Sequence, residues 1–124
     1  LINFVGFFNQ KNKSVVAFHD LKDFDKVRGK FGVGIFNSTQ LIEFQEKPEQ
    51  PKSSLASTCC YIFKKGDLST ISFLLNQKKA DNTGDLIKYL AKDSEVHGFI
   101  FDEHWFDIGS LEMLERAQEY YNEN

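Results

Sequence analysis

The sequence contains no apolar run of about 18 residues, the length that a membrane-spanning helix requires. Its apolar start, residues 1–8, is too short for a span and lacks the basic flank of a signal peptide. We therefore interpret residues 1–8 as core or interface, and expect a cytoplasmic protein with no membrane partner. The chain begins with Leu1 and has no methionine there, which favours a fragment of a longer protein.

Cysteine is scarce, because the chain has only Cys59 and Cys60. Neighbours on a strand point to opposite faces, so a disulfide between them would be strained. No matching Cys or His pair lies nearby, and the 3 histidines are too dispersed for metal-ligand spacing. We expect two reduced, buried thiols.

Basic residues form no long stripe, which argues against a nucleic-acid partner. The formal net charge of the 124 residues is −3, yet a single lysine can hold a phosphate locally. A hydrophobic share of 41% and a charged share of 27% are ordinary for one soluble domain at most. The 13 phenylalanines are expected in the core, since no interleaved Lys and Arg accompany them.

Apolar patterning predicts alternating strands and helices, and hence an α/β arrangement with a mixed sheet. Turn residues 37–40 join two of the strands into a hairpin. The expected strands cover residues 14–19, 31–36, 41–45, 58–63 and 96–101.

Helices are expected after an Asp67 N-cap, over about residues 84–92, and after a Ser110 cap. Asp85 is interpreted as a first-turn charge of the second helix. The inward face of the last helix is predicted to contain Leu111, Leu114, Ala117 and Tyr121. A few strands and helices can bury only a small core, which leaves part of the apolar surface exposed. We therefore predict self-association through this exposed apolar surface.

Reactive side chains stand at the ends of two predicted strands, where open α/β sheets usually bind ligands. Glu46 and Lys47 follow one strand, and Trp105 and Asp107 follow another. Simpler roles also fit these residues: solvated charges for the first two, a core residue for Trp105 and a helix cap for Asp107. Ser110 is the better cap, however.

Five motifs, in order, resemble the hexose-1-phosphate nucleotidyltransferases, which include thymidylyl, uridylyl and guanylyl enzymes. The motifs are Phe31-Gly32-Val33, Glu46-Lys47-Pro48 with its polar loop, the strand at 60–63, Thr83-Gly84-Asp85 before a helix, and residues 105–110. The resemblance covers roughly residues 15–121. It implies the C-terminal, sugar-binding part of a Rossmann-like, GT-A-like layered fold with a mixed sheet and an inserted β-hairpin. Residues 1–124 would be one partial domain without its nucleotide-binding half.

The resemblance also implies roles for individual residues. Lys47 would hold the phosphate of a hexose 1-phosphate and, with Asp107, serve catalysis. Asp107 would be one of two aspartates that hold Mg²⁺, an ion that prefers oxygen ligands. Sugar contacts would come from Phe31, Gly32, Glu46, Ser57 and Trp105.

The implied reaction joins a hexose 1-phosphate to a nucleoside triphosphate and gives a nucleotide-sugar and pyrophosphate. The family's Gly-rich loop, base-binding segment and first metal-binding Asp do not occur in this sequence, so we expect the chain alone to be inactive. Cys59 stands where the family usually has glycine, and Phe31 where it often has tyrosine. A non-catalytic regulatory or assembly domain of the same fold, or an unrelated α/β interaction module, are the alternatives.

Overall fold

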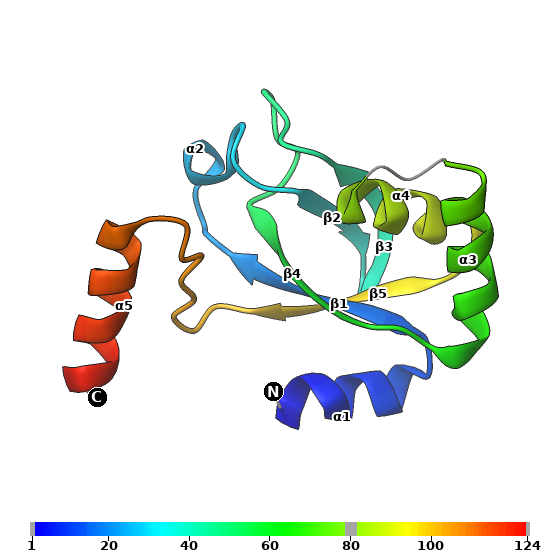
Figure 1. The fold of residues 1–124 in the computed structure, drawn as a ribbon, viewed down its shortest axis with the longest axis horizontal. Coiled ribbons are helices and arrows are strands. Elements are labelled where there is room, and N and C mark those ends of the chain that lie inside the picture. The colour runs from blue at the N-terminus through cyan, green and yellow to red at the C-terminus, as the bar shows by residue number, and fades with distance from the viewer. Residues whose placement is uncertain (1, 79–81, 124) are drawn as a thin grey trace.

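The computed structural model describes residues 2–78 and 82–123. Helices and strands alternate along the chain (Figure 1), which confirms the α/β prediction. In chain order they are α1 (Ile2–Lys11), β1 (Ser14–Asp20), α2 (Phe24–Val27), β2 (Val33–Asn37), β3 (Gln40–Gln45), β4 (Leu55–Ile62), the 3-10 turn η1 (Lys65–Asp67), α3 (Leu68–Asn76), α4 (Thr83–Asp93), β5 (Val96–Phe101) and α5 (Leu111–Glu123).

The five strands form one mixed sheet in the order β1-β4-β2-β3-β5. β1 runs parallel to β5 and antiparallel to β4, and β2 and β3 form the predicted hairpin. The mixed sheet and its hairpin agree with the predicted layered fold, but the sheet also closes into a small barrel, which was not predicted. Gln40 at the hairpin turn pairs with His97, and the Gly98 N–H donates to the Thr39 carbonyl at 2.8 Å. These bonds fold the hairpin back onto β5.

The main core lies between the sheet and α4. Phe18 on β1 and Leu41 on β3 are buried there against Ile87 and Leu90 of α4. The opposite side of β1 is covered by α1, whose Phe4 packs on Val15 and Ala17. Residues 2–8 of the apolar start therefore belong to a helix that contributes to the core.

The N-terminus of α3 differs from the prediction, and that of α4 has a cap that was not predicted. Asp67 precedes α3 but its side chain makes no cap bond. Its buried carboxylate accepts hydrogen bonds from the Ser14 hydroxyl at 2.6 Å and the Ser94 hydroxyl at 2.9 Å, so it joins β1 to the end of α4. Asn82 caps α4 by accepting from the Asp85 N–H at 2.8 Å. Asp85 lies in the first turn of α4, as predicted.

The terminal helix α5 stands apart from the barrel (Figure 1). Ser110 caps it as predicted, since its hydroxyl accepts from the Met113 N–H at 3.2 Å. The predicted inward face is wrong except at Ala117: Leu111 is 70% and Tyr121 64% exposed, and Leu114 is also exposed.

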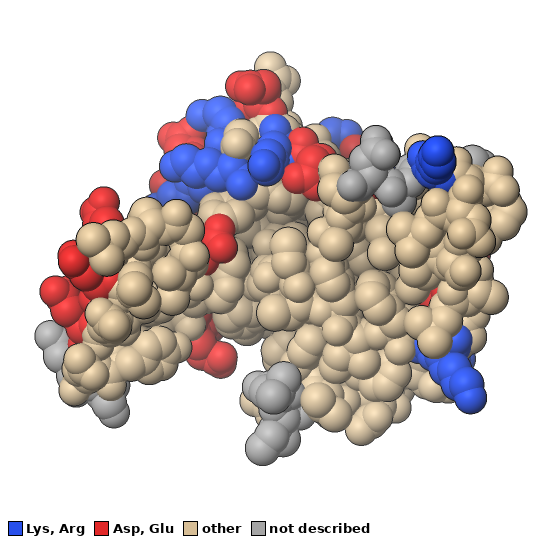
Figure 2. Space-filling model, in the orientation of Figure 1, with Lys and Arg blue, Asp and Glu red and all other residues tan. Residues whose placement is uncertain are grey.

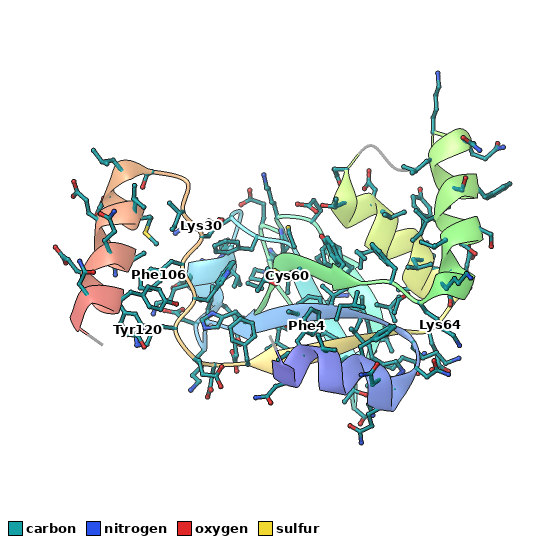
Figure 3. The ribbon with its side chains drawn as sticks, turned by 60° about the horizontal axis from the view of Figure 1, so that its bottom comes forward. Phe4, Lys30, Cys60, Lys64, Phe106 and Tyr120 are labelled. Carbon is teal, nitrogen blue, oxygen red and sulfur yellow. The ribbon has the colours of Figure 1, made fainter. Side chains whose placement is uncertain are left out.

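The aromatic residues of the linker explain the actual orientation of α5. The rings of Phe106 and Tyr120 lie 5.8 Å apart, and that of His104 lies 4.2 Å from Tyr120. Figure 3 shows Phe106 and Tyr120 together beside α5. The helix therefore packs on the preceding segment and leaves its aliphatic side chains exposed.

Some phenylalanines also depart from the expected core: Phe24 and Phe73 are exposed. Exposed apolar side chains on α3 and α5 are consistent with self-association, which stays a prediction. Among the described residues, no helix has both the length and the apolar character needed to cross a membrane.

Candidate functional site

A cleft of about 390 Å³ lies where β3 and β4, the start of α4 and the segment after β5 meet. All seven residues predicted from the sequence line it: Phe31, Gly32, Glu46, Lys47, Ser57, Trp105 and Asp107. Their chemical roles stay predictions. Other lining residues, most of them not anticipated, are Lys30, Phe44, Thr58, Cys59, Tyr61, Asn82, Thr83 and Gly84.

Backbone hydrogen bonds fix the hairpin side of the cleft. The Lys47 N–H donates to the Phe31 carbonyl at 3.2 Å, and the Ser57 N–H donates to the Gly32 carbonyl at 2.8 Å. A Cβ built on Gly32 would lie 2.4 Å from the Phe44 ring. Gly32 is therefore needed for packing against Phe44.

Lys47 has a backbone φ of 44°, in the left-handed region that side chains rarely adopt. Its side chain is exposed at the cleft, and its ammonium forms no ion pair with a described residue. Lys30 lines the same cleft. Figure 2 shows Lys and Arg, interleaved with Asp and Glu, at the top of the molecule around α2. The cleft thus brings two lysine ammonium groups close to the carboxylates of Glu46 and Asp107.

The Glu46 carboxylate lies over the first turn of α4. A Cβ built on Gly84 would be 1.9 Å from Glu46 Oε2 and 3.2 Å from Asn82 Oδ1. Free N–H groups and the helix dipole favour a negative charge at this end of a helix. Gly84 therefore makes room for the carboxylate to reach the cleft.

Replacing Gly84 by alanine is expected to displace Glu46 while the barrel stays folded. The methyl group meets the far end of a flexible side chain, and alanine suits a helix better than glycine by about 1 kcal/mol. Loss of one charged hydrogen bond should weaken, by about 10-fold, the binding of the hexose 1-phosphate that the resemblance implies as ligand. Calorimetric titration measures the affinity and circular dichroism the melting midpoint.

The control for Gly84→Ala is Gly66→Ala, since an added Cβ at Gly66 meets nothing within 4 Å. Equal affinities for the two variants would contradict the role assigned to Glu46.

Ser57, Thr58, Cys59 and Tyr61 of β4 line one side of the cleft, and Thr83 at the start of α4 also lines it. Burial raises the pKa of Tyr61 to about 12, and contact with Cys59 adds to this, whereas hydrogen bonds to Thr83 and Ser57 oppose it. Tyr61 is therefore a neutral phenol at physiological pH. The spacing of two residues from Ser57 could have indicated this wall from the sequence.

We expect the phenolate of Tyr61 to form near pH 12, later than the ordinary tyrosine value of 10.0. Between these values the folded state binds more protons than the unfolded state, so the unfolding free energy should fall as pH rises. Ultraviolet titration measures the phenolate. The Tyr61→Phe variant should lose only the absorbance change near pH 12. If its titration curve superposed on that of the wild type, the change near pH 12 would not belong to Tyr61.

The prediction of buried cysteines was wrong, because Cys59 and Cys60 are both exposed. Cys59 has a φ of 60°, in the left-handed region, and lines the cleft, whereas Cys60 lines a separate apolar cavity. Glycine adopts this conformation without strain. Cys59 thus occupies a position whose backbone suits glycine.

Residues 102–110 carry Trp105 and Asp107 and form neither helix nor strand. The Trp105 ring lies 5.6 Å from that of Phe31 and closes one side of the cleft. Asp107 is exposed at its edge, and Glu46 is the other lining carboxylate. No group of three potential metal ligands occurs among the described residues. Mg²⁺ often takes one or two carboxylates together with phosphates and water, and Asp107 fits that limited role.

Comparison with known proteins gives the family. The family model described as "Nucleotidyl transferase" matches residues 1–124. The chain is 34% identical over 88 residues to glucose-1-phosphate adenylyltransferase of Thermosipho africanus, covering 66% of this chain and 21% of the relative. It is 33% identical over 116 residues to the bifunctional protein GlmU of Methanocaldococcus jannaschii, covering 89% and 26%.

Two solved structures have a fold similar to that of this chain. A protein from Bacillus anthracis assigned as a glucose-1-phosphate thymidylyltransferase, in complex with sucrose, superposes with a TM-score of 0.72 and 27% identity. The match covers 95% of this chain and 47% of that one. The fold also matches apo UDP-glucose pyrophosphorylase, with a TM-score of 0.77, 22% identity, and coverage of 98% and 47%.

The chain thus spans about half of these solved relatives and about a quarter or less of the curated ones. The hypothesis of an unrelated α/β interaction module is wrong, since the chain belongs to the nucleotidyl transferase family.

Proposed function

We propose that this chain is the sugar-phosphate-binding part of a sugar-1-phosphate nucleotidyltransferase and that its cleft binds a hexose 1-phosphate. The observation that carries the proposal is the meeting of all seven predicted residues in one cleft. The family and the relatives named for glucose 1-phosphate support this substrate class.

Each wall of the cleft suits one part of that substrate. Lys47 neutralises and holds the phosphate, because an ammonium forms charge-assisted bonds with phosphate oxygens. Glu46 accepts hydrogen bonds from sugar hydroxyls, and Tyr61 is a protonated phenol that donates one. Trp105 and Phe31 provide apolar surface for the sugar ring.

In the proposed reaction an oxygen of the sugar phosphate attacks the α-phosphate of a nucleoside triphosphate, and pyrophosphate leaves. Such chemistry depends on positioning and charge neutralisation. Lys47 and Glu46 orient the nucleophile in this chain. A bound Mg²⁺, with Asp107 as a ligand, supplies further neutralisation of phosphate charge. The chain covers 47% of each of the two solved relatives, and we propose that the triphosphate binds the part that corresponds to the remainder of those structures. The 124 residues alone are therefore expected to release no pyrophosphate.

The test is calorimetric titration of the chain with glucose 1-phosphate, with and without Mg²⁺. We expect binding that Mg²⁺ strengthens, and Asp107→Asn should remove the Mg²⁺-dependent part, about 10-fold in affinity. Asp102→Asn is the matched control, because Asp102 is exposed and pairs with Lys22 outside the cleft lining.

Absence of binding in both conditions would overturn the proposal. A non-catalytic regulatory or assembly domain of the same fold would then be the favoured hypothesis. The substitution of Cys59 for the family's usual glycine is the observation that favours it.

A further inference from the structure

His19 at the end of β1 is a buried polar residue with no part in the proposed chemistry. It is 8% exposed, and its Nε2 lies 2.8 Å from the Glu103 carbonyl oxygen. A carbonyl oxygen only accepts hydrogen bonds, so Nε2 carries the hydrogen and donates it. The bond links β1 to the segment that follows β5, 84 residues further along the chain.

The imidazole ring makes a second contact with the same segment. Its centroid lies 5.4 Å from the Trp105 ring and 5.0 Å from the Phe101 ring. Trp105 in turn lies 5.6 Å from Phe31 across the cleft. His19 therefore supports the segment at its backbone and beneath the side chain that borders the cleft.

The other ring nitrogen of His19, Nδ1, forms no hydrogen bond with a described residue. Nδ1 is also buried. A buried unpaired acceptor is costly, so packing alone would favour phenylalanine at this position. Histidine combines a flat ring with an N–H at its far edge, and both of these features are used on the Glu103–Trp105 segment.

We propose that His19 is a positioning residue that holds residues 103–107, and with them Trp105 and Asp107, against the cleft. Its relevance to substrate binding rests on the proposed function, whereas the restraint on Trp105 does not. Residues 102–110 have no helix or strand bonds of their own. The hydrogen bond from His19 therefore adds a fixed backbone attachment to the ring contact between Trp105 and Phe31.

The chain offers a direct readout, because Trp105 is its only tryptophan. His19→Phe keeps the ring and removes both the donor and the unpaired Nδ1. We expect an unchanged or higher melting midpoint, together with an acrylamide quenching constant of Trp105 raised about twofold. A merely structural role for His19 would give a lower midpoint without a local change at Trp105.

The matched control is His97→Phe. His97 lies at the start of β5, where its ring nitrogens contact Thr39 at 2.8 Å and Glu95 at 3.1 Å. It should leave the quenching of Trp105 unchanged. His19→Gln offers an N–H near the original donor position and should restore most of the protection; it also serves if His19→Phe fails to fold.

Unchanged quenching in His19→Phe, or equal increases in His19→Phe and His97→Phe, would overturn the proposal. If His19→Phe does not fold, the test passes to His19→Gln. A folded His19→Gln variant in which acrylamide quenches Trp105 as a fully exposed tryptophan would also overturn the proposal.

Titration with glucose 1-phosphate and Mg²⁺ separates this proposal from the function itself. His19→Phe should weaken binding about 10-fold, because the cleft loses a fixed wall. If the wild type binds no glucose 1-phosphate, the proposed function fails while quenching still decides the restraint. If the wild type binds and His19→Phe binds equally well, the positioning role is wrong.

Discussion

Replacing Lys47 by glycine is expected to weaken hexose 1-phosphate binding about 10- to 100-fold without destabilising the protein. A hydrogen bond to a charged group contributes about 1.5–3 kcal/mol, which corresponds to that range of affinity. The Lys47 ammonium has no ion-pair partner among the described residues, so its removal leaves no buried charge unpaired.

The backbone makes glycine the informative substitution at this position. Lys47 has a φ of 44°, where a side chain costs about 1 kcal/mol that glycine avoids. Lys47→Gly should therefore fold at least as well as the wild type, so a loss of affinity reports on the ammonium itself. Lys47→Ala would mix the loss of charge with continued backbone strain.

Lys78→Gly is the control for both effects. Lys78 is an exposed lysine with a φ of 55° and does not line the cleft. It should show the same change in melting midpoint as Lys47→Gly and wild-type affinity for glucose 1-phosphate. If Lys47→Gly bound glucose 1-phosphate with wild-type affinity, Lys47 would have no role in binding. This conclusion would hold whether or not Asp107→Asn loses the Mg²⁺-dependent part of the affinity.

The parts of this fold that depend on local pattern could be predicted from the sequence. The turn residues after Phe36 produced the β2–β3 hairpin, and the Ser110 hydroxyl caps α5 as its position indicated. Glu46 and Trp105 were grouped from family motifs, and both line the cleft. Local chemistry and motif order were sufficient for these features.

The features that sequence reasoning missed depend on partners far apart in the chain. Barrel closure rests on backbone contacts between the hairpin turn and β5: the Gly98 N–H donates to the Thr39 carbonyl at 2.8 Å, and Gln40 pairs with His97. Asp67 lies at the position expected for a helix N-cap. Its carboxylate instead accepts hydrogen bonds from two serine hydroxyls of other elements. Periodicity along one segment carries no information about such partners.

The exposed thiols and the orientation of α5 have a related explanation. The left-handed backbone at Cys59 is a single-residue conformation that β-strand patterning does not reveal. The face of α5 was assigned from aliphatic spacing, whereas aromatic contacts with Phe106 determine its packing. Where a helix lies apart from the main core, a few ring contacts can outweigh an apolar stripe.

Phe18→Ala is expected to lower the free energy of unfolding by about 3–5 kcal/mol, the range for a fully buried phenylalanine. Phe18 is 0% exposed and lies at the centre of the main core. Its ring packs edge-on against Phe36 at 5.0 Å and lies 6.5 Å from Phe44. Total stabilities of domains are about 5–15 kcal/mol, so this one change removes much of the margin.

The neighbouring glycine limits how far the structure can relax around the cavity. A Cβ on Gly34 would lie 2.6 Å from the Phe18 ring, so the backbone of β2 already touches the ring face and has no side chain to fill the space left behind. Phe44 loses a supporting ring and also lines the cleft, so hexose 1-phosphate affinity should fall together with stability.

Urea unfolding followed by circular dichroism measures the effect of Phe18→Ala, with Phe24→Ala as the matched control. Phe24 is 50% exposed, and its truncation should cost about 0.5 kcal/mol or less. If both variants lost the same stability, the core around Phe18 would not be the main source of cohesion, and the barrel contacts of Thr39 would have to supply it. If Phe18→Ala lost stability but kept wild-type affinity, Phe44 would hold the cleft wall without Phe18, and core and site would be energetically separate.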